Sequence, residues 1–558
     1  MRPLNTLKTK RFPGLVRHGW SWRSLPVLPL SLALLVGLPV LVVSSALLTP
    51  TREVWLHLGR TLLPEMSRNT LMLLVGVGAG TLLLGVSLAW LVSAYRFPGH
   101  GMLEWLLVLP MAMPTYVQAF VYMATLDFAG PVQSFLRLHF PGIAWLPEIR
   151  SGAGAILVMT LVLYPYVYLL ARAAFREQSG VLLEAARVMG YGPTAIFFRV
   201  ILPLARPSIA AGLALAVMEA LADFATVRFL NFPTLSDGVI RVWYGMMNLR
   251  AASELAGLLA VVALAILLLE YALRGRSRYF QVGGKAPGIA LSGLRGWRGY
   301  LASAACLLVV GIAFALPVAQ LLSWALKELL SQPAGALEVY ARLAQNSILL
   351  SLLAALFASI TALLLASGVR TSGNKAAFIL ARLATSGYAM PGAVIAVGII
   401  GPLSAFDHAL NNLLQAWRGT GVGLLLTGSV IGLVYAYVVR FMSIGFSSVD
   451  ASLEKITPNV TAAARILGAG PWRLLRHIHL PLVAPGMLAG AILIFVDVMK
   501  ELPITLMLRP FGYDTLAVWV WQMAAESAWG GASLPALAIV LTGLIPVVFL
   551  MRAASRSY

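Results

Sequence analysis

The stretch EAARVMGYGPTAIFFRVILPLARPSIAAG, residues 184–212, decides the fold because a related stretch occurs later in the chain. Residues 462–490 read AAARILGAGPWRLLRHIHLPLVAPGMLAG, and the two copies align without a gap at an offset of 278 residues (184 against 462). Glycines and prolines coincide along the alignment, Gly190 with Gly468 among them. Chance does not explain this agreement, so the chain contains an internal repeat whose period is about half its length.

Each copy is predicted to form a helix, a turn and a second helix outside the membrane. Ala186 and Arg187 favour a helix, and Gly190 stands where a residue in the left-handed conformation would end it. Pro193 suits the first turn of the next helix, and Pro203 is expected to break that helix. Two short, partly basic helices that project from apolar segments are typical of docking sites for a partner protein.

The composition places the chain in a membrane. It has 558 residues, of which 59% are hydrophobic and 11% charged, more apolar surface than a soluble fold could bury. The net charge of +20 comes from basic residues between apolar segments, which indicates orientation in a bilayer and no nucleic-acid partner. The single cysteine, Cys306, excludes a disulfide framework and a cysteine metal site.

Twelve apolar segments are long enough to cross the roughly 30 Å of a bilayer core. Residues 1–24 are basic without an acidic residue, so both chain ends are expected in the cytoplasm. Six spans per half then give two repeats of parallel topology with a pore between them. The expected spans cover residues 25–48, 69–94, 103–126, 152–175, 207–227, 255–273, 300–324, 346–369, 378–401, 422–446, 482–505 and 533–552.

The expected domains are a first half at residues 1–273, a basic cytoplasmic linker at 274–298 and a second half at 299–558. The linker combines arginines and lysine with glycines and contains no carboxylate, which predicts a flexible cytoplasmic connection. The tripeptide Ala-Met-Pro at residues 112–114 recurs at 389–391, so the repeat extends beyond the docking motif. Both prolines lie inside expected spans, where they predict kinks.

Both copies of the repeat resemble the EAA motif in the membrane subunits of bacterial binding-protein-dependent ABC importers. The resemblance implies an all-α polytopic membrane protein with the type I importer permease fold, in which each motif forms a cytoplasmic helix that docks into a separate ATPase subunit. Ala462 stands where the first copy has Glu184, so the second copy lacks the family's acidic contact. The coupling motifs span residues 184–203 and 462–481, and the implied ATPase-coupling residues are Glu184, Ala185, Ala186, Arg187, Gly190, Pro203, Ala462, Ala463, Ala464, Arg465, Gly468 and Pro481.

A second resemblance concerns the cargo. Residues 501–517, ELPITLMLRPFGYDTLA, are similar to a signature of permeases in the ferric-iron importer subfamily, in which one fused chain carries both halves. Fused permeases for thiamine and for phosphonates are similar, so these cargoes stay open as alternatives. The resemblance implies a multi-pass protein of the bacterial inner membrane, two ABC ATPase subunits on its cytoplasmic side and a substrate-binding protein outside.

The fifth expected span of each half contains two carboxylates, four in all. Glu219 and Asp223 are four residues apart on one helix face, and Asp497 and Glu501 occupy the corresponding positions at the same offset. A charge near the bilayer centre costs at least about 2.5 to 3.5 kcal/mol, so these groups should face the protein interior or water. They are either an acidic gate on a cation's route or structural partners, with Lys500 paired to a carboxylate and the others capping backbone near a helix end.

The sequence contains no GxxxxGK[ST] phosphate loop and no metal-binding motif, so no catalytic residue, metal or cofactor is expected in this chain, and ATP is expected on the partner subunit. The leading hypothesis is a fused importer permease, with ferric iron as the cargo. The rival hypothesis is a secondary transporter or channel driven by an ion gradient through the carboxylates. A structural membrane scaffold is a third possibility, but it has no reason to keep two docking motifs.

Overall fold

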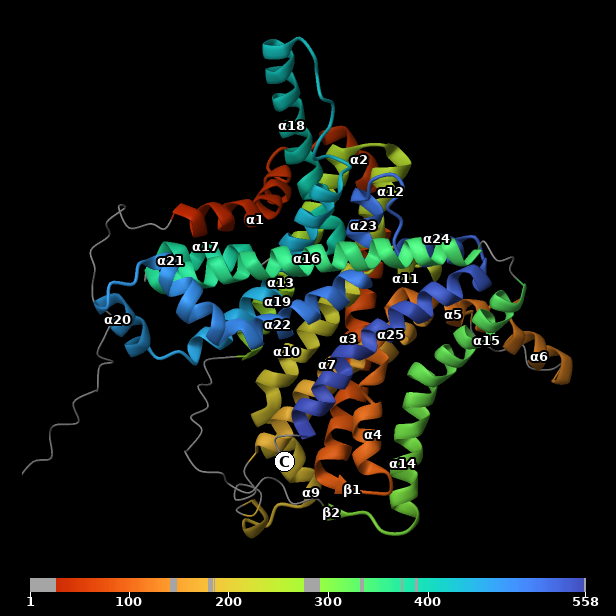
Figure 1. Ribbon diagram of the computed structural model, residues 1–558. Helices are drawn as coiled ribbons and strands as arrows, with labels where there is room; N and C mark the ends of the chain where they lie inside the picture. Colours follow the sequence, from red (N-terminus) through yellow and green to blue (C-terminus); the bar gives the residue numbers. More distant parts are fainter. Residues whose placement is uncertain are drawn as a thin grey trace, which may run out of the picture.

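The computed structural model describes residues 27–555 apart from 141–147, 179–183, 185, 275–291, 332–335, 373–374, 386 and 388–389. The expected basic N-terminus and most of the expected linker therefore lie outside the described residues. The described chain is helical, as predicted, with one two-residue strand pair (Figure 1).

The elements before the linker are α1 (Val27–Ala46), α2 (Arg52–Arg60), α3 (Leu63–Ala94), β1 (Tyr95–Arg96), α4 (His100–Leu106), η2 (Leu109–Ala112), α5 (Thr115–Leu126), α6 (Pro131–His139), α7 (Gly152–Glu177), α9 (Pro193–Ile196), η3 (Phe197–Ile201), α10 (Leu202–Ala222), α11 (Ala225–Phe229), α12 (Leu235–Met246) and α13 (Leu249–Arg274).

The elements after it are β2 (Ser292–Gly293), α14 (Trp297–Val310), η4 (Gly311–Ala315), α15 (Leu316–Ser331), α16 (Ala336–Ser372), α17 (Lys375–Thr385), α18 (Gly392–Arg418), α19 (Val430–Glu454), α20 (Pro458–Ile466), α21 (Pro471–Leu474), η6 (Leu475–His479), α22 (Leu480–Met499), α23 (Pro503–Leu508), α24 (Leu516–Ala525) and α25 (Trp529–Ser555).

The membrane spans follow the expected plan with two exceptions. Within the described residues, 10 helices are long and apolar enough to cross a bilayer, and one bent pair raises the number to 11. The first expected span corresponds to α1, whose apolar part, Leu30–Ala46, is shorter than these helices. The expected spans 103–126 and 378–401, for which proline kinks were predicted, are interrupted: the first bends by 90° between η2 and α5, and the second divides between α17 and α18.

The repeated Met-Pro pair explains both exceptions. Pro114 and Pro391 are not kinks inside spans but the residues that immediately precede new helices, α5 and α18, with extended backbone angles (ψ 144° and 143°). Proline also disfavours the helical conformation of the residue before it, so a helix tends to end there and a new one starts after the proline. Ala389 of the second tripeptide lies outside the described residues.

The two halves share a three-helix core. In the first half α3, α7 and α10 pack against one another, and α16, α19 and α22 do the same in the second half. Both α7 and α19 begin at a serine cap, where Ser151 accepts a hydrogen bond from the amide of Gly154 (3.2 Å) and Ser429 one from that of Gly432 (3.3 Å). These caps are again 278 residues apart, so the repeat holds in three dimensions as well as in sequence.

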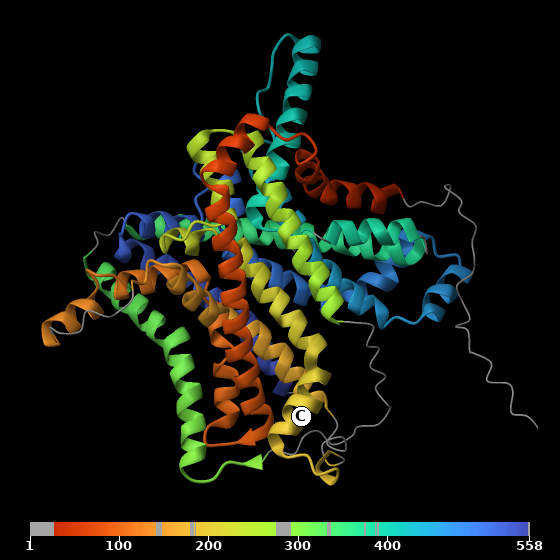
Figure 2. The ribbon, with the colours of Figure 1, turned by 180° about the vertical axis from the view of Figure 1, so that it is seen from behind.

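The halves are interlocked by their first helices. Helix α1 packs on α16, α17 and α18 of the other half, where the Tyr435 hydroxyl donates to the Leu35 carbonyl (2.6 Å). A second contact between the halves involves the π-helical turn η4. Its Ile312 carbonyl accepts a hydrogen bond from the hydroxyl of Tyr122 in the first half (2.6 Å). Figures 1 and 2 show α14 and α15 lying along the first half. The sequence predicted two lobes but not this exchange.

The docking turns lie at two adjoining sides of the molecule. In Figure 1, α9, which follows the first turn, lies at the bottom of the molecule, and α21, which follows the second turn, lies at its left-hand side, whereas α18 is at the top and α6 at the right. Figure 2 shows the same separation from behind. The two turns are not at opposite ends of the molecule, so the arrangement does not contradict the docking hypothesis.

Close helix contact at Gly212 gives a stability prediction. A Cβ atom at this position would lie 2.8 Å from the carbonyl oxygen of Tyr166 in α7, a contact with backbone that cannot move away cheaply. We expect Gly212→Ala to lower the free energy of unfolding by about 1 to 3 kcal/mol, measured by thermal unfolding in detergent. Gly101→Ala in α4, where the added atom meets nothing within 4 Å, is the matched control and should be neutral or stabilising. Equal stability of the two variants would contradict the prediction.

Candidate functional site

The two docking turns have the predicted backbone geometry. Gly190 and Gly468 adopt left-handed φ angles of +83° and +80°. In the first turn the Tyr191 amide donates to the Ala186 carbonyl (3.1 Å), and in the second the Ala469 amide donates to that of Ala464 (3.0 Å). This bond across five residues is the mark of a helix closed by a glycine. The glycine ends of both helices are therefore confirmed.

The expected break at Pro203 is wrong. Helix α9, the π-helical turn η3 and helix α10 run on as one apolar span from Thr194 to Ala222, and α21, η6 and α22 do the same from Trp472 to Met499. A proline clashes with the carbonyl four residues earlier, but the wider π-turn just before Pro203 and Pro481 relieves that clash. The second helix of each motif is thus the start of the fifth span.

The turns present apolar side chains outward. Val188 is 89% exposed and Ile466 86%, and Met189, Leu467 and Trp472 are also exposed. Exposed apolar side chains grouped on projecting turns are typical of contact surfaces for another protein. Of the coupling residues named above, Glu184, Arg187, Gly190, Ala462, Ala463, Gly468 and Pro481 are exposed, Ala186 and Ala464 are buried, and Pro203 is exposed, whereas Ala185 and the Arg465 side chain lie outside what the structure describes.

The second turn has a support that the sequence did not indicate. Arg370, in the last turn of α16, donates to the carbonyls of Leu453 and Ile456 at the end of α19. The Leu453 carbonyl also accepts from the backbone amides of Lys455 and Ile456. A guanidinium is a favourable further partner for carbonyls at the end of a helix. Helix α20, which carries Ala462–Arg465, begins two residues after Ile456 and is positioned by this contact.

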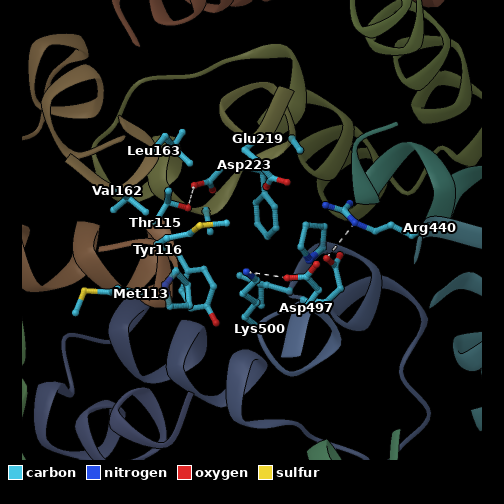
Figure 3. A pocket seen from close by; sticks show the side chains of 18 of the residues that line it. Met113, Thr115, Tyr116, Val162, Leu163, Glu219, Asp223, Arg440, Asp497 and Lys500 are labelled. Atoms are coloured by element: carbon cyan, nitrogen blue, oxygen red, sulfur yellow. Dashed lines mark hydrogen bonds and ion pairs between the residues drawn. The ribbon is translucent and has the colours of Figure 1, made fainter. Parts of the chain in front are cut away.

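All four predicted carboxylates line one cavity between the halves. The cavity has a volume of about 110 Å³, and its wall contains Glu219 and Asp223 from the first half and Asp497 and Glu501 from the second (Figure 3). Two cations, Arg440 and Lys500, lie in the same wall. The wall also contains Val162, Ala222, Thr115 and Tyr116.

Three of the carboxylates have the structural contacts that the second interpretation expected. Asp497 pairs with Lys500 (Oδ1 to Nζ, 2.9 Å), and Glu501 pairs with Arg440 (Oε2 to Nε, 3.3 Å) and accepts from the backbone amide of Ile504 (3.2 Å). Asp223 follows the last residue of α10 and accepts from the Thr226 amide (2.9 Å) and from the hydroxyls of two threonines, Thr115 and Thr226. These contacts offset part of the cost of burying charge.

Glu219 differs from the other three. In the part of the chain that the structure describes, no hydrogen bond or ion pair reaches its carboxylate, although it lines the cavity. A carboxylate that faces a cavity without a protein partner can bind a ligand without first losing an internal contact. The cation-route interpretation therefore fits Glu219, and the structural one fits Asp223, Asp497 and Glu501.

Of the two cations in the cavity wall, Lys500 was predicted as a partner of a carboxylate, whereas Arg440 was not predicted. At the offset of 278, Lys500 corresponds to Ala222 and Arg440 to Val162, and all four line the cavity. Arg440 comes from α19, the fourth long helix of its half, and extending the alignment over that helix would have revealed an arginine opposite a valine. Both cations thus belong to the second half.

Comparison with known proteins agrees with this architecture. Residues 81–273 and 354–558, together more than half of the chain, match the family described as "Binding-protein-dependent transport system inner membrane component". A relative from Haemophilus influenzae, the "Fe(3+)-transport system permease protein FbpB 2", is 26% identical over 94% of this chain and 98% of its own length. The "Probable ABC transporter permease protein y4fN" of Sinorhizobium fredii is 26% identical over 87% of each chain. The "Molybdenum transport system permease protein ModB" of Escherichia coli is 28% identical over 33% of this chain and 80% of its own.

These relatives are transport permeases, not enzymes, and they match a chain with 10 long apolar helices among its described residues. The family unit is matched twice, once on each side of the linker region, in agreement with the duplicated turns and the duplicated three-helix cores. The chain is a multi-pass membrane protein that belongs to the family of inner-membrane components of binding-protein-dependent transport systems, with the family unit present twice.

Proposed function

We propose that this permease imports a cation, ferric iron, through the cavity between its halves. The observation that carries the proposal is the charge of the cavity wall, where four carboxylates face two cations. An anionic cargo would be repelled by this excess of negative charge, whereas a hard cation prefers oxygen ligands. The relative whose name includes Fe(3+) covers 94% of this chain, whereas the molybdenum relative covers 33%.

The driving force in this proposal is ATP hydrolysis on two separate subunits that dock on the turns around Gly190 and Gly468. A substrate-binding protein delivers the cargo from the outer side, and both chain termini and the linker, residues 274–298, lie in the cytoplasm. Residues 1–273 and 299–558 then act as two halves that rock against each other. The matching left-handed turns at Gly190 and Gly468 support this arrangement.

Reconstituted transport tests the proposal. Proteoliposomes that contain the full chain, its ATPase subunits and its binding protein should take up radioactive ferric iron only when ATP is supplied. Thiamine and a phosphonate, tested in the same vesicles, should not be carried. Uptake that needs an ion gradient and no ATPase would show instead a secondary transporter, and uptake of thiamine or phosphonate without iron would show a different cargo.

A further inference from the structure

The cavity is asymmetric in charge although the halves repeat. In the second half Lys500 holds Asp497 and Arg440 holds Glu501, whereas the corresponding positions of the first half carry the uncharged Ala222 and Val162. A cation that enters the cavity therefore meets carboxylates on one side that already have a positive partner. On the other side, Asp223 is held by hydroxyls and an amide, and Glu219 by neither.

Tyr116 also lines the cavity. Tyr116, in α5, is 5% exposed, and among the described residues its hydroxyl has no hydrogen-bond partner. Figure 3 shows Tyr116 and Glu219 among the side chains that surround the cavity. An unbonded hydroxyl at a buried site is unfavourable unless a ligand or water satisfies it. Phenol and carboxylate oxygens are both hard donors, so a cavity lined by such residues suits a hard cation.

The oxygens are not arranged as a closed metal cage. Within the described part of the chain, no three Asp, Glu, His or Cys side chains converge on one point where they could hold a metal ion. A cation in this cavity would therefore keep other ligands and exchange quickly. Such a site suits passage, because tight retention would slow release.

We propose that Glu219 contacts a hard trivalent cation inside the cavity, and that Lys500 is a tethered counter-cation that competes with the cargo for Asp497. This inference rests on the proposed function only in that the cargo is a cation. The positive charge of Lys500, 2.9 Å from Asp497, keeps the affinity of the cavity low and allows the cargo to leave. The first half has no such competitor, because Ala222 occupies the equivalent position.

Binding of Tb³⁺, a luminescent hard trivalent cation, tests the inference. The full chain is placed in nanodiscs of zwitterionic lipid, which do not attract the ion, and titrated with Tb³⁺. Lys500→Ala, which copies Ala222, should tighten binding by at least about tenfold because a like charge next to the site is removed. Glu219→Gln should weaken it by at least about tenfold. Asp127→Asn, an exposed carboxylate outside the cavity, should leave the affinity unchanged.

A second lysine variant keeps the Tb³⁺ test decisive. Lys500→Met, which keeps most of the side-chain volume, should tighten binding as Lys500→Ala does, so a folding defect of the alanine variant does not end the test. Unchanged affinity in both the lysine variants and Glu219→Gln would overturn the inference. If wild-type vesicles import iron while these affinities stay unchanged, the inference alone fails. If the affinities move as expected while no iron is imported, the cavity inference stands and ferric iron is the wrong cargo.

Discussion

Gly468→Val is expected to lower ATP-driven uptake by about tenfold or more while leaving the chain folded. Gly468 has a φ of +80°, and a residue with a side chain pays about 1 to 2 kcal/mol to adopt this left-handed conformation, with β-branched valine at the high end. The helix end would rearrange, and the apolar residues Ile466 and Leu467 would turn away from the partner. A cost of this size lowers the docked population about tenfold or more. Uptake and ATP hydrolysis, measured in the same proteoliposomes, should separate, with uptake lowered and hydrolysis retained.

Gly470 supplies the matched control for this prediction. It lies in the same turn, its φ is not in the left-handed region, and an added Cβ atom would meet nothing within 4 Å. Gly470→Ala should therefore transport normally, whereas Gly190→Val, at the equivalent position of the first turn (φ +83°), should repeat the defect of Gly468→Val. Full uptake by Gly468→Val would show that the left-handed turn does not transmit the ATPase movement.

The features that could be predicted from the sequence are those fixed by local chemistry and by the repeat. Gly190 and Gly468 mark left-handed helix ends because few other residues tolerate that conformation. The offset of 278 places Glu219 opposite Asp497 and Asp223 opposite Glu501, and a two-fold arrangement of halves brings equivalent helices to a common interface. That all four carboxylates line one cavity follows from this symmetry.

The features that could not be predicted depend on how neighbouring turns and helices adapt. Proline rules predicted a break at Pro203, but a π-turn of one extra residue absorbs the clash, and no sequence signal specifies such a turn. Likewise, the ion pair between Arg440 and Glu501 joins α19 to the segment after α22, and only the packing of those helices brings them together. The exchange of first helices between the halves is a third feature that could not be predicted, because apolar periodicity does not indicate which half a helix packs against.

The largest stability effect is expected at Glu104, where α4 meets α7. Its side chain is 7% exposed and forms ion pairs with two arginines, Arg172 and Arg176, the latter at 2.8 Å. Arg172 is itself 9% exposed and lies with its guanidinium carbon 4.6 Å from the centre of the Trp105 ring. Removing the shared carboxylate leaves two positive charges close together in a poorly solvated site. We expect Glu104→Ala to lower the free energy of unfolding by about 3 to 5 kcal/mol, the usual cost of breaking a buried ion pair.

An exposed ion pair in the same half is the control that shows whether burial of the charge causes the loss of stability. Asp127 pairs with Arg150 at 2.7 Å, but the two side chains are 33% and 47% exposed, so Asp127→Ala should cost less than about 1 kcal/mol. Glu104→Gln, which keeps the shape of the side chain and removes its charge, should behave like Glu104→Ala in thermal unfolding followed by tryptophan fluorescence. If Glu104→Gln were as stable as the wild type, packing around α4 would account for the loss, and the charge of Glu104 would not. If both variants unfolded like Asp127→Ala, water would have to reach the two arginines, and α4 and α7 would be held together by their apolar contacts alone.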